Sequence, residues 1–178
     1  FTPYDAKGLL KSAIRDEDPV LIMESEKMYG DKGEIPEGEY LIPIGQASIR
    51  RQGTDCTIVS FGKILKTVHA AADELAKDGI DVEIVDLRTI RPLDIETVLE
   101  SVKKTGRLVV VEEGFPVASI ASEVGYRVQR HAFDYLDAPI RRVCQTDTPF
   151  AFSTSLIEEA LPQVADVIRT VKEVNYVA

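Results

Sequence analysis

Hydrophobic and polar residues follow a regular order from residue 54 onward. Short apolar runs are each followed by a longer stretch in which apolar residues recur every three or four positions. The short runs have the composition and length of buried strands, and the longer stretches have the spacing of amphipathic helices. Strands are therefore predicted at residues 56–62, 82–88, 108–114 and 140–145.

The helices predicted between these strands begin and end at recognisable residues. Asp94 is a candidate N-cap, Pro92 lies in the first turn of the same helix, and Gly106 ends it. Repeated strand–helix–strand connections of this length build a parallel sheet. The predicted fold class is therefore α/β, with a mostly parallel sheet and helices on both of its faces. The other helices are expected at 63–79, 119–135 and 155–175, the last interrupted by Pro162.

The first 44 residues follow a different pattern. Asp5 is expected to cap a helix over 6–15, VLIM at 20–23 reads as a strand, and a stretch rich in Gly, Pro and Glu follows. One helix and one four-residue strand cannot bury both of their faces alone. We therefore expect them to be the last helix and strand of a truncated α/β domain, which makes the chain a C-terminal portion. The expected units are residues 1–25, a linker at 26–44 and an α/β domain at 45–178.

Composition and charge narrow the choice of partners. The chain is 44% hydrophobic and carries a formal net charge of −9. Nucleic acid and anionic membranes repel such a chain, whereas a cationic protein surface attracts it. No apolar run approaches the roughly 20 residues that a membrane span requires. Cys56 and Cys144 belong to no CxxC pattern, so we expect small buried residues on strands rather than a disulfide or a zinc site.

A search for catalytic motifs finds none. The two histidines, His69 and His131, are expected on helices at the boundary with solvent, and the sequences HExxH and GxSxG do not occur. The glycines at 30, 33 and 38 lie in the linker rather than between a strand and a helix, so they form no phosphate loop.

The best-placed candidate for a ligand site follows the third predicted strand. Glu112 and Glu113 end this central strand, and the amides near Ser119 open the next helix. The carboxyl ends of parallel strands border the crevice in which α/β proteins usually bind ligands. The alternative is that Ser119 is an ordinary helix cap and that the glutamates bind Arg88, Arg91 or a neighbouring domain.

Several longer stretches occur together in one known family. They are DAKGLLKSAIRDEDPV, LIPIGQASIRRQG, DLRTIRPLD, VVVEEG, FDYLDAPIRRV and LPQVADVIRTVKEV. With these the chain resembles, over essentially its whole length, the beta subunits of pyruvate dehydrogenase, the first component of 2-oxo acid dehydrogenase complexes. The resemblance implies oxidative decarboxylation of pyruvate with acyl transfer to lipoyl groups. It also implies thiamine diphosphate and magnesium as cofactors, and assembly of two alpha subunits with two beta subunits.

The resemblance gives each expected unit an identity. Residues 1–25 resemble the tail of the pyrimidine-binding domain, and residues 45–178 resemble the transketolase-like C-terminal domain. In the family, the glutamate and histidine that act on the cofactor lie in the earlier domain. No catalytic and no cofactor-binding residue is therefore carried over to this portion. Arg88 and Arg91, in DLRTIRPLD, are expected to secure loop and domain interfaces rather than to hold a substrate.

A potassium site also follows from the resemblance. In family members that bind a structural potassium ion, the matching segment supplies ligands that correspond to the carbonyls of Ala13 and Ile14, with Asp16 and Asp18. Oxygen donors suit such a hard cation. The alternative is a solvated helix end rich in acidic residues.

A docking site is the second feature carried over. In the family, two carboxylates of the beta subunit meet arginines of the peripheral subunit-binding domain of dihydrolipoyl acetyltransferase. Here they correspond to Asp137 and the C-terminal carboxylate of Ala178. Arg–carboxylate pairs suit an acidic chain that binds a basic module. The alternative is that Asp137 only shapes the turn before Ala138 and Pro139.

Two other functions stay open on the sequence. The chain can be a non-catalytic assembly module in its own right, or part of another transketolase-like thiamine-diphosphate enzyme. The expected location is the bacterial cytoplasm, or the mitochondrial matrix in a eukaryote.

Overall fold

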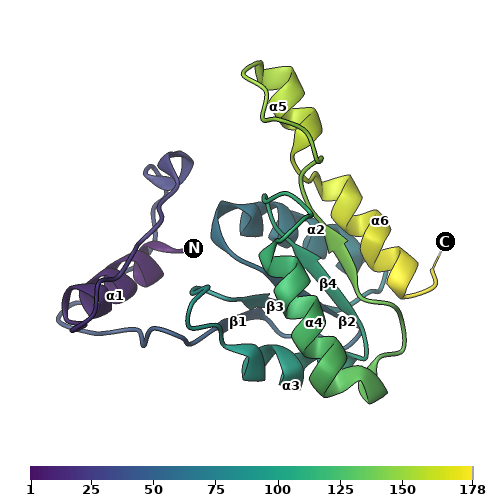
Figure 1. Ribbon diagram of the computed structural model, residues 1–178, viewed down its shortest axis with the longest axis horizontal. Coiled ribbons are helices and arrows are strands. Elements are labelled where there is room, and N and C mark those ends of the chain that lie inside the picture. The colour runs from purple at the N-terminus through teal and green to yellow at the C-terminus, as the bar shows by residue number, and fades with distance from the viewer. Residues whose placement is uncertain (178) are drawn as a thin grey trace.

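A five-stranded sheet forms the centre of the computed structural model, which describes residues 1–177 (Figure 1). The strand order is β1-β3-β2-β4-β5, and β2 pairs in parallel with β3 and β4, as β4 does with β5. The predicted α/β class and mostly parallel sheet are confirmed. The strands are β1 Ser48–Arg51, β2 Cys56–Ser60, β3 Val82–Asp86, β4 Leu108–Val111 and β5 Arg141–Val143.

The edge strand β1 is a feature that the sequence pattern does not predict. It reads SIRR, with one apolar residue, and it pairs with β3 in the antiparallel direction. The register shifts between Ile49 and Arg51, which makes Arg50 the extra residue of a bulge. Charged side chains and a bulge are common on edge strands, because both discourage pairing with another chain.

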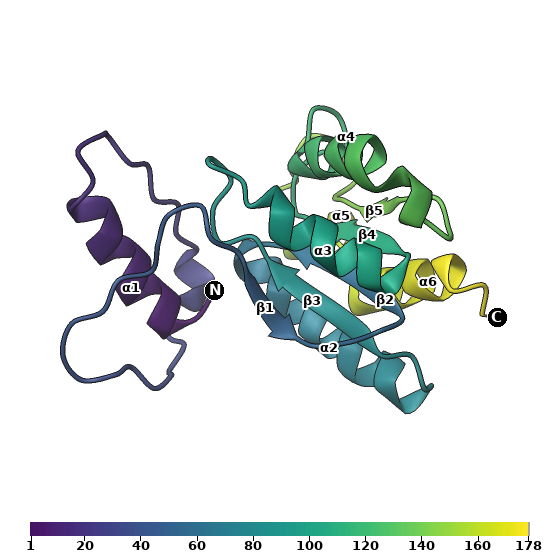
Figure 2. The same cartoon turned by 90° about the horizontal axis from the view of Figure 1, so that it is seen from below.

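Helices cover both faces of the sheet, as predicted (Figure 2). On one face α2 and α6 pack on strand residues such as Ile58 and Ile84, and on the other α3 and α4 pack on Val59 and Val85. Neighbouring strand residues point to opposite faces, so each of the three central strands β2, β3 and β4 contributes to both clusters. The helices are α2 Leu65–Lys77, α3 Ile95–Thr105, α4 Ile120–Ala132, α5 Thr154–Ala160 and α6 Val164–Val174, with Pro162 between the last two.

The helix boundaries test several predictions. The side chain of Asp94 accepts a hydrogen bond from the Thr97 amide, and Gly106 ends α3 in the left-handed conformation. Ser119 caps α4 by accepting from the Ser122 amide. These three assignments are confirmed, whereas Pro92, expected in the first turn of α3, lies two residues before its N-cap. None of the described helices is both long enough and apolar enough to cross a membrane.

The cap of the first helix is a correction. α1 spans Pro3–Ile14, and its N-cap is Thr2 rather than Asp5. Asp5 occupies the third helical position, where its carboxylate accepts from the backbone amide of Thr2 while the Thr2 hydroxyl accepts from the Asp5 amide. The pair is a capping box, which satisfies two helix-end donors at once.

The strand predicted at 20–23 is wrong. VLIM forms no sheet pairing, and Leu21 and Met23 are 87% and 88% exposed. An extended apolar run becomes a strand only when a neighbouring edge supplies hydrogen bonds, and no described strand lies beside it. The only other helical turn before the sheet is at Glu26–Met28. Figures 1 and 2 show α1 and this turn beside the sheet, joined to β1 by an extended connection.

Candidate functional site

The carboxyl ends of β2 and β4 meet where the chain changes direction across the sheet. From β2 the chain passes to β3 on one side, whereas β4 lies on the other side of β2. Such switch points form the crevice in which α/β proteins commonly bind ligands. This edge carries Ser60, Lys63, Glu112 and Glu113. The ligand site predicted after the third strand, at Glu112 and Glu113, therefore lies at the switch point of the sheet.

Glu112 is committed to holding the local structure. Its side chain is 2% exposed, and Oε1 accepts a hydrogen bond from the Ala121 amide (3.1 Å) in the first turn of α4. A carboxylate at a helix N-terminus complements the dipole and one of the unpaired amides. The side chain therefore closes the N-terminus of α4 to other anions, and no arginine lies among its described hydrogen-bond partners.

Glu113 and Ser60 are likewise engaged. Glu113 pairs with Lys63, which joins the loop after β4 to the loop after β2 across the switch point. The Ser60 hydroxyl is buried and donates to the Val111 carbonyl (2.8 Å). A nucleophilic serine needs a side-chain base within hydrogen-bond reach. Among the described residues, no side chain accepts a hydrogen bond from the Ser60 hydroxyl. The side chains of Ser60, Glu112 and Glu113 are therefore all engaged in contacts within the fold.

Burial shifts the pKa values of the two cysteines and of His69. Burial raises the pKa of Cys56 to about 12. Burial, followed by the nearby Glu112 carboxylate, raises the pKa of Cys144 to about 11. Both thiols are protonated at neutral pH and are poor nucleophiles. Cys144 lies after β5 and is half-buried, which corrects the expectation of a buried strand residue. His69 lies on α2, and its ring stacks on the ring of Phe1. Burial lowers the pKa of His69.

The two arginines of DLRTIRPLD have different surroundings. Arg88 contacts the buried carboxylate of Asp5 through Nε (3.0 Å) and Nη2 (2.8 Å). It therefore secures an interface between α1 and the sheet, as expected. Arg91 is exposed, and its side chain has no hydrogen bond or ion pair among the described residues.

The segment predicted to bind potassium lies at the end of α1. Residues from Ile14 to Asp18 are exposed, and the Asp16 carboxylate accepts from the Asp18 amide (3.0 Å). The Ala13 carbonyl accepts from the Arg15 and Asp16 amides. The group is rich in oxygen atoms, which suits a hard cation. The described residues contain no cluster of three or more His, Cys, Asp or Glu side chains fit for a metal ion.

The segment predicted to dock a partner lies at the end of the sheet opposite the switch point, beside the end of α3. Asp137 is exposed, its amide donates to the Gly106 carbonyl (2.8 Å), and its carbonyl accepts from the Tyr176 hydroxyl (3.2 Å). The structure thus places Asp137 beside Tyr176, near the end of the described chain. Ala178 itself falls outside the described residues.

Aromatic residues around Asp137 were not found by sequence reasoning. Phe133, Tyr135 and Tyr176 are 60%, 52% and 71% exposed, and the Lys103 ammonium lies 5.6 Å from the centre of the Tyr135 ring. Exposed aromatic rings are enriched in protein interfaces. The available signal was the sequence FDYLD, in which two aromatic residues alternate with acids.

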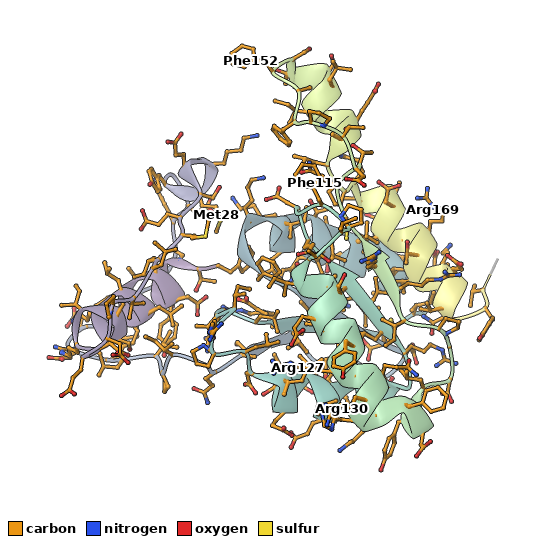
Figure 3. All side chains as sticks on the ribbon, viewed as in Figure 1. Met28, Phe115, Arg127, Arg130, Phe152 and Arg169 are labelled. Atoms are coloured by element: carbon orange, nitrogen blue, oxygen red, sulfur yellow. The ribbon has the colours of Figure 1, made fainter. Side chains whose placement is uncertain are left out.

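A second group of exposed apolar residues lies at the other end of the molecule. Phe115, in the loop after β4, and Phe152, just before α5, are 45% and 102% exposed. They lie far from Arg130, near the end of α4, with α4 running between the two ends (Figure 3). Phe115 thus precedes the start of α4, whereas Phe133 and Tyr135 follow its end.

Comparisons with known proteins agree with this architecture. The chain is 53% identical over 99% of its length to a protein of Rhizobium meliloti named pyruvate dehydrogenase E1 component subunit beta, and spans 38% of that relative. The corresponding mitochondrial protein of Dictyostelium discoideum is 46% identical, with 98% of this chain and 50% of that one covered. The resemblance to pyruvate dehydrogenase beta subunits is confirmed, and the chain spans half or less of these relatives.

Another relative and a solved structure widen the comparison. The beta subunit of an acetoin:2,6-dichlorophenolindophenol oxidoreductase of Cupriavidus necator is 51% identical, with 93% of this chain and 49% of that one covered. A split-gene transketolase, solved as an inactive beta4 tetramer, superposes with a TM-score of 0.68 at 25% identity, covering 82% of this chain and 46% of that one. The transketolase C-terminal domain family matches residues 45–167. Since this match takes in the whole sheet and more than half of the chain, the chain belongs to the transketolase C-terminal domain family.

Proposed function

We propose that the chain is part of the beta subunit of a pyruvate dehydrogenase, which decarboxylates pyruvate oxidatively and transfers the acyl group to lipoyl groups. The observation that carries this proposal is the 53% identity to a pyruvate dehydrogenase beta subunit, sustained over 99% of the chain. In this proposal residues 1–25 are the tail of the pyrimidine-binding domain, residues 26–44 are the linker, and residues 45–178 are the C-terminal domain.

This portion serves assembly and docking rather than chemistry. Thiamine diphosphate and magnesium belong to the complete enzyme, in which thiamine diphosphate would supply the carbanion chemistry of decarboxylation and magnesium would bind its phosphate oxygens. The residues at the switch point support this division, since Glu112, Glu113 and Ser60 are all engaged in contacts within the fold. The partners are the alpha subunit, a second beta subunit and the peripheral subunit-binding domain of dihydrolipoyl acetyltransferase. The complex works in the bacterial cytoplasm, or in the mitochondrial matrix if the source is eukaryotic.

The docking site in this proposal is centred on Asp137. Asp137 is exposed, its backbone carbonyl accepts a hydrogen bond from the Tyr176 hydroxyl, and the exposed Tyr135 stands two residues earlier in the chain. An anionic group beside aromatic rings suits an arginine, which pairs with the carboxylate and stacks on the rings. The carboxylate of Ala178 supplies the second anionic group in this proposal.

A potassium ion at the end of α1 is a further part of the proposal. The carbonyls of Ala13 and Ile14, with the side chains of Asp16 and Asp18, supply the oxygen donors. The last carbonyls of a helix carry partial negative charge, so a cation at this position is favoured. Asp16 and Asp18 then hold the turn after α1 in place.

The test is a calorimetric titration of the chain with the cognate peripheral subunit-binding domain. Asp137→Ala is expected to weaken binding about thirtyfold or more, because removing one partner of an interfacial charge pair costs about 2 kcal/mol or more. The control is Asp134→Ala, which removes the same charge from an exposed position three residues earlier. Equal weakening by the two variants would mean that only net charge matters. Undiminished binding by Asp137→Ala would remove the docking role.

Acetoin is the second candidate substrate. The acetoin oxidoreductase subunit is 51% identical to the chain, close to the 53% of the pyruvate relative. Assays of the assembled enzyme with pyruvate and with acetoin decide between them.

The 25% identical split-gene transketolase supports another transketolase-like enzyme more weakly. Failure to bind an alpha subunit would favour that enzyme or an independent assembly module.

A further inference from the structure

A fully buried carboxylate joins the N-terminal segment to the sheet. Asp5 is 0% exposed, although it lies in the first turn of a helix at the edge of the molecule. Oδ1 accepts from Arg88, and Oδ2 accepts from Arg50 and from the Thr2 hydroxyl (2.7 Å). A buried charge requires such partners, because its hydration is lost. The site is therefore built around one carboxylate and two guanidinium groups.

The second half of the network lies at the end of β3. Arg50 donates to Asp86 through Nε (3.0 Å) and Nη2 (2.7 Å), and Asp86 is 1% exposed. The other oxygen of Asp86 accepts from the Arg88 amide (3.0 Å). Two aspartates and two arginines thus balance in charge. The set of Asp5, Arg50, Asp86 and Arg88 is called the ionic latch below.

Local backbone features aim both arginines at Asp5. Arg50 is the bulged residue of β1, and a bulge turns its side chain away from the regular alternation of the strand. Arg88 has a φ of 56°, in the left-handed region that is unfavourable for a residue with a side chain. Strain of this kind persists where surrounding contacts require it. Here the Asp5 and Asp86 contacts supply that requirement.

The latch is continuous with the loop that follows β3. The Gly45 amide donates to the Thr89 hydroxyl (3.1 Å), which donates to the Pro92 carbonyl (2.9 Å). The Ala47 amide donates to the Asp94 carboxylate (2.8 Å), which also caps α3. The loop 87–94 is thus fixed at its start by α1, and along its length by residues 45–47, which precede β1.

We propose that the ionic latch positions the N-terminal segment, residues 1–44, on the sheet and couples it to the order of the loop 87–94. When Asp5 is withdrawn, Arg88 loses the contact that holds its left-handed backbone, and the loop relaxes together with α1. This assigns a role to the arginine of DLRTIRPLD as a positioning residue that acts on the relation between two parts of the chain. The proposal does not depend on the docking function of Asp137.

The test is amide hydrogen exchange on the whole 178-residue chain, comparing Asp5→Asn with the unaltered protein. We expect exchange in α1 and in residues 87–94 to accelerate about tenfold or more, because a buried ion network loses a partner. Exchange in β2 and β4 should stay unchanged. The control is Glu39→Gln, which removes the exposed ion pair of Glu39 with Arg15 in the same segment and should change neither region.

Each other outcome overturns part or all of the proposal. Accelerated exchange in α1 alone removes the coupling to the loop, and unchanged exchange in both regions removes the latch. Arg88→Met approaches the same contact from the opposite side and should accelerate the same two regions. Chain-wide acceleration in both variants would show that these residues belong to the global fold, which also contradicts a latch.

Discussion

Different interactions stabilise residues 45–177 and hold residues 1–44 in place. In the larger part, two clusters of buried Val, Ile, Leu and Ala side chains lie on opposite faces of one sheet. In α1 the only buried residues are Asp5 and Gly8, and large apolar residues such as Leu21 and Met23 are almost fully exposed. Apolar burial acts through many contacts, whereas the attachment of α1 depends on a few polar contacts and on Phe1, which stacks on His69 and packs against one cluster. A single substitution should therefore have very different consequences in the two parts.

The largest expected effect is in the apolar clusters. Leu75, on α2, is 0% exposed, and Leu75→Ala should lower the free energy of unfolding by about 3 kcal/mol, because it removes buried surface and leaves a cavity. Leu21→Ala removes the same atoms from an 87% exposed position and should change it by less than about 0.5 kcal/mol. Denaturant titration of both variants measures the contrast. Equal losses would mean that residues 20–23 are buried in solution.

Acid should act on the N-terminal segment through Asp5. Burial alone would raise the pKa of Asp5, but hydrogen bonds from Thr2 and the charge of Arg50 outweigh it and hold the pKa well below its usual value of 3.8. Since the folded pKa is depressed, the stabilisation is complete above the unfolded pKa and is lost as pH falls through the folded one. Protection of α1 in hydrogen exchange should therefore decline as pH falls below about 4. Asp5→Asn should abolish that dependence, and an unchanged dependence would assign it to another group.

A smaller effect is expected where α3 ends beneath Asp137. Gly106 has a φ of 69°, and a Cβ there would lie 2.4 Å from the Asp137 carboxylate. Gly106→Ala should lower the free energy of unfolding by about 1–2 kcal/mol, from backbone strain and crowding together. It should also displace the Asp137 carboxylate and weaken binding of the peripheral subunit-binding domain. Gly38→Ala is the control, since Gly38 also has a positive φ but no atom near the added Cβ. If both variants weakened binding equally, the loss would come from backbone strain rather than from displacement of the Asp137 carboxylate.

The sequence predicts the larger part better than the smaller one, for a physical reason. Runs such as VEIVD and LVVV are strands because both faces are covered, and their composition records that burial. Asp94, Gly106 and Ser119 act through neighbours only a few residues away, so local rules find them. The contact of Arg88 with Asp5 joins residues 83 positions apart, and no local rule anticipates it. VLIM is misread as a strand for the same reason, because pairing depends on a distant edge.

The candidate sites divide in the same way. Asp137 and the oxygen donors at the end of α1 are predicted through the family resemblance rather than through any local rule. Tyr135 and Tyr176 are found only in the structure, where the end of the described chain reaches the turn at Asp137. The left-handed backbone of Arg88 and the bulge at Arg50 are likewise invisible in sequence, since neither residue favours that geometry. Contacts made across the fold therefore set the limit of prediction.

The smallest contrast compares two N-caps of the same kind. Ser119 caps α4 within the larger part, and Ser119→Ala should lower the free energy of global unfolding by about 1 kcal/mol. Thr2→Ala removes the cap of α1 and a hydrogen bond to Asp5, yet it should leave global unfolding unchanged and accelerate exchange only in α1. The reason is that α1 can open while both apolar clusters stay intact. Denaturant titration and hydrogen exchange on the same two variants separate the effects. A global loss in Thr2→Ala would mean that the two parts unfold as one cooperative unit, so that the ionic latch contributes to the fold itself rather than to the attachment of α1.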